Sequence, residues 1–141
     1  MIQGGVFTGM DISASALAAE RARMNVVANN LANVNTTHDY YGNRVPYRRR
    51  RIHFAAGAPQ VTGHRHLGVR VDRITEDPSN FKQVYQPGHP DANEEGYVLY
   101  PNVEVVVEMV DMMMASRAYE ANVTSMEASK QILRGALQII A

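Results

Sequence analysis

The side chains with the widest chemical repertoire in this chain are its five histidines. His64 and His66 stand on either side of one arginine, with His53 and His89 the nearest histidines before and after them. Imidazole is a common zinc ligand, but these spacings match no zinc pattern, and the sequence contains no HExxH helix. Because the chain has no cysteine, thiolate ligands, thiol nucleophiles and disulfides are excluded as well. We therefore expect no metal site and no cofactor.

Carboxylates offer a second candidate chemistry between Asp91 and Gly96, which imitates the first half of an EF-hand calcium loop. The twelfth position of such a loop should be a bidentate glutamate, and here it is Asn102. The segment is therefore predicted to be a turn beside an acidic patch. The sequence also lacks a glycine-rich phosphate loop, a GxSxG elbow and an isolated Ser/His/Asp arrangement. No catalytic residue is assigned, and an enzyme is not expected.

A run of four arginines, Arg48, Arg49, Arg50 and Arg51, is the densest charged feature. On a strand it would split into two pairs that face opposite ways. The run could form salt bridges to neighbouring subunits, protect a sheet edge from unwanted pairing, or bind nucleic acid. We favour the first, because 14 basic and 14 acidic residues leave no net charge to attract nucleic acid or a membrane surface.

Charge is nevertheless unevenly distributed along the chain. Between Arg44 and Arg73 eight basic residues face one acid, which gives +7, whereas between Glu76 and Glu127 ten acids face two bases, which gives −8. Such blocks either meet on adjacent copies of the chain or neutralise each other within one fold. If the blocks meet on adjacent copies, Glu94 and Glu95 of one copy are the predicted partners of the arginine run of the next.

The elements that must position these residues fall into three parts. Residues 1–37 predict a helix, with Asp11 and Ser13 as candidate N-caps and polar residues ending it near Thr37. Its narrow apolar seam comprises Leu17, Met24 and Leu31 at heptad spacing, widened by Val27. Residues 38–101 contain all six prolines and predict a small β-rich subdomain with strands near 47–54, 69–74, 81–85 and 97–100.

Residues 102–141 predict one long helix with Asn102 as its N-cap. Its apolar residues follow a heptad pattern through Val105, Met109, Met112, Ser116, Tyr119, Val123, Met126, Lys130, Leu133, Leu137 and Ile140. A helix from 102 to 140 would be about 58 Å long, whereas a compact domain of this size is about 37 Å across. The fold class is therefore mainly α with a small β subdomain. The N- and C-terminal helices are expected to pair as an elongated coiled coil, leaving part of the seam for other chains.

Several segments resemble bacterial flagellar axial proteins, and the rod proteins of the basal body in particular. The stretch from Ser13 to Thr37 contains the ANNLAN motif, and the chain also carries VPYRR from Val45, PGHPDA from Pro87 and EANVT from Glu120. The resemblance covers essentially the whole chain except the segment Gly57–His66 and residues 1–9, whose roles stay open. It adds the motif residues Asn29, Asn30, Asn33, Asn35 and Asn122 to the candidate interface.

The resemblance implies a subunit of a helical tube that transmits torque from the rotor to the hook and forms the channel for exported subunits. It implies contacts with copies of itself, other rod proteins, rotor or MS-ring and export-gate neighbours, and the flagellar type III export apparatus. It places the protein in the periplasm-spanning rod, which agrees with the absence of a recognisable cleavable signal peptide and of an apolar run that could span a membrane. The alternative is another coiled-coil structural or adaptor protein of a type III system.

Overall fold

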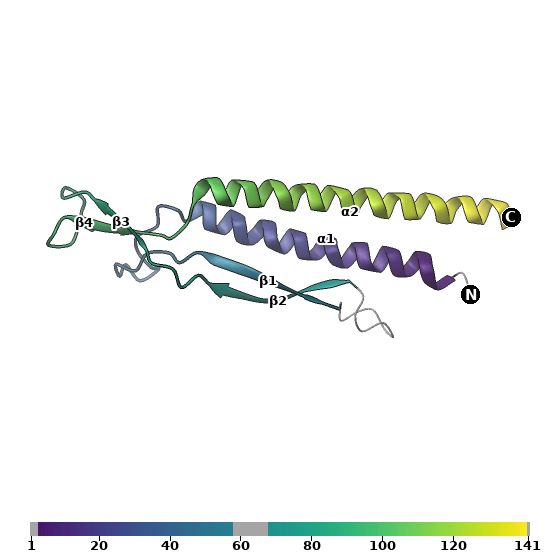
Figure 1. Ribbon diagram of the computed structural model, residues 1–141, viewed down its shortest axis with the longest axis horizontal. Helices are drawn as coiled ribbons and strands as arrows, with labels where there is room; N and C mark the ends of the chain where they lie inside the picture. Colours follow the sequence, from purple (N-terminus) through teal and green to yellow (C-terminus); the bar gives the residue numbers. More distant parts are fainter. Residues whose placement is uncertain (1–2, 58–67, 141) are drawn as a thin grey trace.

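Two long antiparallel helices form the axis of the molecule (Figure 1). The computed structural model describes residues 3–57 and 68–140. Helix α1 spans Gln3–Ala32 and helix α2 spans Val105–Ile140, and the described chain begins and ends at the same end of the pair. With 36 residues α2 is about 54 Å long. The expected class, mainly α with a small β part, is confirmed.

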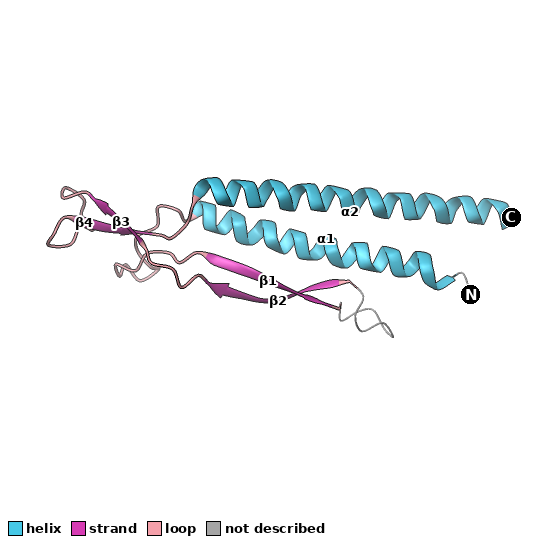
Figure 2. Ribbon diagram, in the orientation of Figure 1, coloured by secondary structure: helices cyan, strands magenta, loops and turns pink. Residues whose placement is uncertain are grey.

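The residues between the helices form two separate antiparallel hairpins (Figure 2). Strands β1 (Arg50–Ala56) and β2 (Val69–Glu76) pair with a register shift between His53 and Phe54, and they lie along α1 on the side opposite α2. Strands β3 (Lys82–Tyr85) and β4 (Tyr97–Tyr100) project beyond the end of the helical pair. The four predicted strands are therefore present, although β1 begins and ends later than expected. Of the segment Gly57–His66, all but Gly57 lies outside the described residues.

Helix α1 begins earlier than the sequence predicted. Asp11 and Ser13, the expected N-caps, lie inside the helix, which passes through Gly9 without interruption. A helical glycine costs about 1 kcal/mol relative to alanine, and the packing of α1 against α2 outweighs that local preference. Farther along, Ser15 Oγ donates to Ile12 O at 2.7 Å and accepts from Val69 N at 3.1 Å, which connects α1 to the start of β2.

Helix α2 begins at Val105, so Asn102 is not its N-cap. The Asn102 side chain instead joins two loops. Its Oδ1 accepts from Arg49 N at 2.8 Å, and its Nδ2 donates to Ser79 Oγ at 2.7 Å. The prediction failed because the same side-chain groups that cap a helix can also satisfy a distant backbone N–H, and here tertiary contacts prevail.

The face that α2 buries is broader than the predicted heptad. Its buried and half-buried residues are Val105, Glu108, Asp111, Met112, Ala115, Ser116, Ala118, Tyr119, Asn122, Val123, Met126, Ser129, Leu133 and Gly135. The heptad positions Ser116 and Val123 are thus partly covered, whereas Glu108, Ala115, Asn122 and Ser129 lie outside the predicted seam. Small and polar residues at these places let α1 approach closely, and a search for apolar residues passes over them. Met109 is 50% exposed and Leu137 59%, Lys130 is exposed too, and the side chain of Ile140 lies outside the described part. The roles of these residues between subunits remain predictions.

On α1, Val26 and Val27 are buried, whereas Leu17, Met24 and Leu31 are half-buried. Among the described residues, neither helix carries an apolar stretch long enough to cross a membrane.

Candidate functional site

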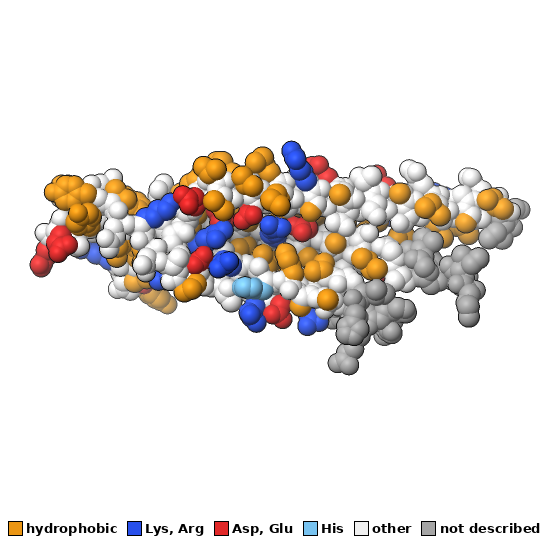
Figure 3. Space-filling model, viewed as in Figure 1, with side chains coloured by type: hydrophobic (Ala, Val, Ile, Leu, Met, Phe, Trp, Pro, Cys, Tyr) orange, Lys and Arg blue, Asp and Glu red, His pale blue; other side chains and the backbone are white. Residues whose placement is uncertain are grey.

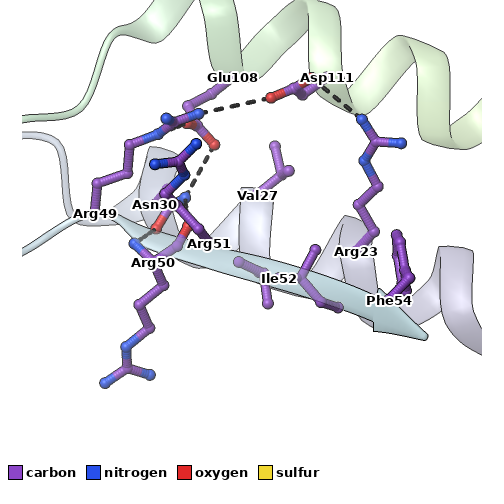
Figure 4. A pocket seen from close by; sticks show the side chains of 11 residues that line it. Arg23, Val27, Asn30, Arg49, Arg50, Arg51, Ile52, Phe54, Glu108 and Asp111 are labelled. Carbon is purple, nitrogen blue, oxygen red and sulfur yellow. Dashed lines mark hydrogen bonds and ion pairs between the residues drawn. The ribbon is translucent and has the colours of Figure 1, made fainter. Parts of the chain in front are cut away.

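A cleft of about 330 Å³ lies where α1, α2 and β1 meet (Figure 4). Its apolar side is formed by valines of α1 and by Ile52 and Phe54 of β1. Its polar side carries Arg23 of α1 and Arg49, the residue before β1, opposite Glu108 and Asp111 of α2, and Figure 4 shows these side chains converging. The junction therefore brings together three segments that are far apart in the sequence.

Glu108, on the first turns of α2, is the centre of this polar network. Its side chain is only 1% exposed, so its carboxylate needs partners inside the protein. Arg49 Nε donates to its Oε1 at 2.6 Å, and Asn30 Nδ2 donates to its Oε2 at 3.0 Å. The buried carboxylate is thereby paired both with a cation from the strand side and with a neutral donor from α1.

Arg49 extends the network to further carboxylates. Its Nη1 lies 3.6 Å from Asp77, and its Nη2 lies 3.6 Å from Asp111, which also pairs with Arg23 of α1 at 3.3 Å. Burial of Arg49 opposes its charged form, but the hydrogen bond and charge of Glu108, with the charges of the two aspartates, hold the pKa of the guanidinium above its ordinary value. This arginine remains charged and joins the start of β1 to α2 and to the loop of Asp77.

Asn30, near the end of α1, is 1% exposed and connects Glu108 to the strand side. Its Oδ1 accepts from Tyr47 Oη at 2.9 Å, and the same amide also bonds to the backbone of β1. Burial raises the pKa of the Tyr47 phenol above its ordinary value, although the charge of Arg50 partly offsets this. Tyr47 therefore remains a hydrogen-bond donor at neutral pH.

A second cluster fixes the segment after α1 to the turn before β4. Asp91 accepts from Thr37 Oγ1 at 2.9 Å, and His38 Nε2 lies 3.0 Å from its other carboxylate oxygen. Arg44 donates to Pro90 O at 3.0 Å. Across the described residues no group of three histidine or acidic side chains is placed to hold a metal ion, and His64 and His66 lie outside that part. The network around Glu108 and the cluster around Asp91 each hold together segments that are far apart in the sequence.

The four arginines of the predicted run have different environments. Arg48 donates to Asp77 O at 2.9 Å and lies over the Phe81 ring at 4.4 Å. Arg49 forms its ion pairs within the chain, with Glu108, Asp77 and Asp111, and its predicted role between subunits remains a prediction. Arg50 and Arg51 are exposed, and Figure 4 shows the Arg50 side chain extending away from Glu108.

Glu94 and Glu95 are exposed in the turn between β3 and β4. Their contact with Arg50 or Arg51 of another copy remains a prediction, as do the interface roles of the candidates on the helices. Of the motif residues, Asn30 is buried in the network, whereas Asn29 and Asn33 donate to backbone oxygens of α1 and Asn35 is exposed. Asn122 donates to Ala118 O at 2.8 Å and is half-buried.

Sequence reasoning missed Glu108 and Asp111, the acidic partners of Arg49. Both lie off the predicted heptad, so the apolar pattern gave no reason to place them in the interior. Glu108 occurs three residues after Val105 and four before Met112, so it interrupts the stripe that faces α1. An acid at that spacing is the signal that could have identified a buried ion pair.

The outer surface of α2 is apolar over its first turns. Val106, Val107, Met109, Val110, Met113 and Met114 are all exposed. Figure 3 shows hydrophobic side chains gathered over this part of α2. Contiguous exposed apolar patches are typical of surfaces that another molecule covers.

Family models match both ends of the chain. The model described as "Flagella basal body rod protein" matches residues 10–38, which cover most of α1 and the first residues after it. The model described as "Flagellar basal body rod FlgEFG protein C-terminal" matches residues 94–139, which cover β4 and almost all of α2.

Curated relatives extend the similarity to nearly the full length. The chain is 46% identical to the flagellar basal-body rod protein FlgC of Bacillus subtilis, over 94% of this chain and 97% of that protein. It is 42% identical to FlgC of Borreliella burgdorferi, over 96% and 98% respectively, and 43% identical to FlgC of Salmonella typhimurium, over 87% and 89%. The chain therefore belongs to the FlgC family of flagellar basal-body rod proteins and is a structural subunit of the rod.

Proposed function

We propose that this subunit assembles with its own copies and with other rod proteins into a helical tube that transmits torque to the hook and encloses the export channel. The single observation that carries the proposal is the elongated α1–α2 pair with an apolar outer surface on α2. A monomer gains nothing from exposing this surface, whereas a subunit surrounded by neighbours buries it.

The buried network suits a part under mechanical load. Arg49 and Asn30 connect β1 to both helices through short hydrogen bonds to Glu108. A twisting force applied to the hairpin side would pass to the helices through this network and through the packing of α1 on β1 and β2. The role is mechanical, and no catalytic one is proposed.

The finer partners and location belong to the same proposal. The partners are the rotor or MS-ring and export-gate neighbours. The subunit leaves the cytosol through the flagellar type III export apparatus, and it lies in the part of the rod that crosses the periplasm. The names of the relatives support a position in the basal-body rod. The alternative, an adaptor of a type III system, requires no permanent place in that structure.

Deletion of the gene and imaging of isolated basal bodies distinguish the two. We expect the deletion to abolish swimming and hook assembly, and a tagged chain that restores swimming to be found in the rod. Cells that lack the chain yet still assemble hooks would instead support the adaptor.

A further inference from the structure

Two tyrosines in the segment between α1 and β1 are the most exposed aromatic side chains of the described protein. Tyr40 is 97% exposed and Tyr41 85%, and their rings meet edge to face with centroids 5.5 Å apart. An aromatic ring can bury roughly 150 to 250 Å² on contact. Leaving both rings in water is therefore unfavourable unless another molecule covers them.

The turn that carries these rings is held by many hydrogen bonds. Asp39 Oδ1 accepts from Tyr41 N at 2.9 Å and from Asn43 N at 2.8 Å, while Oδ2 accepts from Asn43 Nδ2 at 2.8 Å. Gly42 has a φ of 82°, which favours glycine, and its N–H donates to Asp39 O. The contacts of Thr37, His38 and Arg44 with the Pro90–Asp91 turn fix both ends of the segment.

A fixed turn with two exposed tyrosines has the properties of a preformed contact site. Tyrosine brings a large contact area with little side-chain freedom to lose, and it is enriched among residues that dominate interface energies. Because the turn is already ordered, binding through it does not have to fix the loop.

The exposed patch on the first turns of α2 offers a complementary surface within the same sequence. Met109, Met113 and Met114 contribute thioethers among the valines of this patch, and methionine sulfur makes favourable contacts with aromatic rings. The patch and the tyrosine turn both belong to the end of the molecule where α1 ends and α2 begins. In Figure 1 the segment after α1 leads to β1, which lies on the side of α1 opposite α2.

We infer that Tyr40 and Tyr41 of one copy dock on the Val106–Met114 surface of a second copy. The two copies lie side by side, with their corresponding ends at the same height. Because the two surfaces differ, the contact is heterologous, and its repetition produces a ring or a helix of subunits rather than a closed dimer. The inference rests on the proposed function and adds to it the surfaces through which neighbouring copies meet.

Photo-cross-linking in basal bodies tests this contact. Cells would make two forms of the full chain with different tags, one of which carries p-benzoylphenylalanine in place of Tyr40. After irradiation of isolated basal bodies, we expect cross-linked peptides that join position 40 to residues 106–114 of the other tagged form. Three results would overturn the inference: cross-links found only within one tagged form, cross-links only to a different protein, or no cross-links although both forms are incorporated.

Paired variants of the second form give the matched control. The substitutions Val110→Asp and Met113→Asp should reduce the cross-link yield per incorporated copy at least tenfold. Ile132→Asp, at a more exposed apolar residue near the other end of α2, should leave the yield within twofold. Equal cross-link yields from the patch variants and from Ile132→Asp would also contradict the contact. Absence of the unsubstituted tagged chain from basal bodies would overturn the proposed function itself, whereas its presence without these cross-links would overturn only the inference.

Discussion

The side-chain amide of Asn30 forms hydrogen bonds with both backbone groups of Arg50, in the way that a neighbouring strand would. Asn30 Oδ1 accepts from Arg50 N at 2.9 Å, and Asn30 Nδ2 donates to Arg50 O at 2.9 Å. An unpaired strand edge exposes such groups and invites association with other chains. Helix α1 thus closes the free edge of β1 where the strand begins, and it fixes the position of Arg49 beside Glu108.

Replacement of Asn30 by alanine should be strongly destabilising. It removes the partners of Arg50 N, Arg50 O, Tyr47 Oη and one oxygen of the buried Glu108. Each buried polar group left unsatisfied costs about 1 to 3 kcal/mol, and partial entry of water lowers the sum. We expect the free energy of unfolding in urea to fall by about 3 kcal/mol.

The adjacent Asn29 provides the control. Its side chain is exposed and donates only to Asn25 O within α1. Asn29→Ala should change the free energy of unfolding by less than about 0.5 kcal/mol, as surface substitutions usually do. Equal effects of the two substitutions would show that the Asn30 network contributes little to stability.

Charge reversal should destabilise the fold strongly at Arg49 and very little at the adjacent Arg50. Arg49→Glu places a second carboxylate against buried Glu108 and removes its cation, and breaking a buried pair costs about 3 to 5 kcal/mol. The Arg50 side chain is exposed, so Arg50→Glu should change the stability of the monomer by less than about 1 kcal/mol. Thermal unfolding followed by circular dichroism measures both, and a stable Arg49→Glu monomer would contradict the role given to this ion pair.

The sequence predicted the elements whose patterns are local. The heptad spacing of apolar residues from Val105 onward placed the second helix, and alternating apolar residues such as those around Val98 placed the strands. The ANNLAN motif pointed to the family, and Asn30 within it proved to be a buried residue. These features depend on propensity, periodicity or direct resemblance.

The sequence could not show which charges meet. Arg49 lies 59 positions from Glu108, and only the packing of β1 against α1 and of α1 against α2 brings their side chains together. Likewise, the buried face of α2 includes Ser129, whose type carries no hydrophobic signal, and Ala115, whose single methyl group carries only a weak one. Asn102 has the composition of an N-cap but satisfies Arg49 N instead. Long-range partners, rather than local preference, decide each of these cases.

Acid should weaken the loop around Asp77. Hydrogen bonds from the backbone and side chain of Ser79, together with the charges of Arg51 and Arg49, lower the pKa of Asp77 below its ordinary value of 3.8. Because the folded-state pKa is the lower one, this contribution to stability is present above pH 3.8 and is lost as the pH falls through the folded value.

Asp77→Asn tests the origin of that loss. The substituted chain should be less stable than the wild type at pH 7, and the difference should shrink as the pH falls below about 4. Urea unfolding at a series of pH values measures it. A difference that stays constant down to pH 2 would show that the charge of Asp77 plays no part.

The close approach of α1 and α2 at Ala115 gives a test of the observed helix face. Ala115 is 0% exposed, so a larger side chain there must push the helices apart or force strained rotamers, at a cost of about 1 to 3 kcal/mol. We expect Ala115→Leu to lower the free energy of unfolding by that amount. Ala121 is exposed on the same helix, and Ala121→Leu should change it by less than about 0.5 kcal/mol. In the predicted heptad Ala115 lies outside the seam and both leucines would be tolerated, so urea unfolding of the two variants decides between the predicted and the observed face.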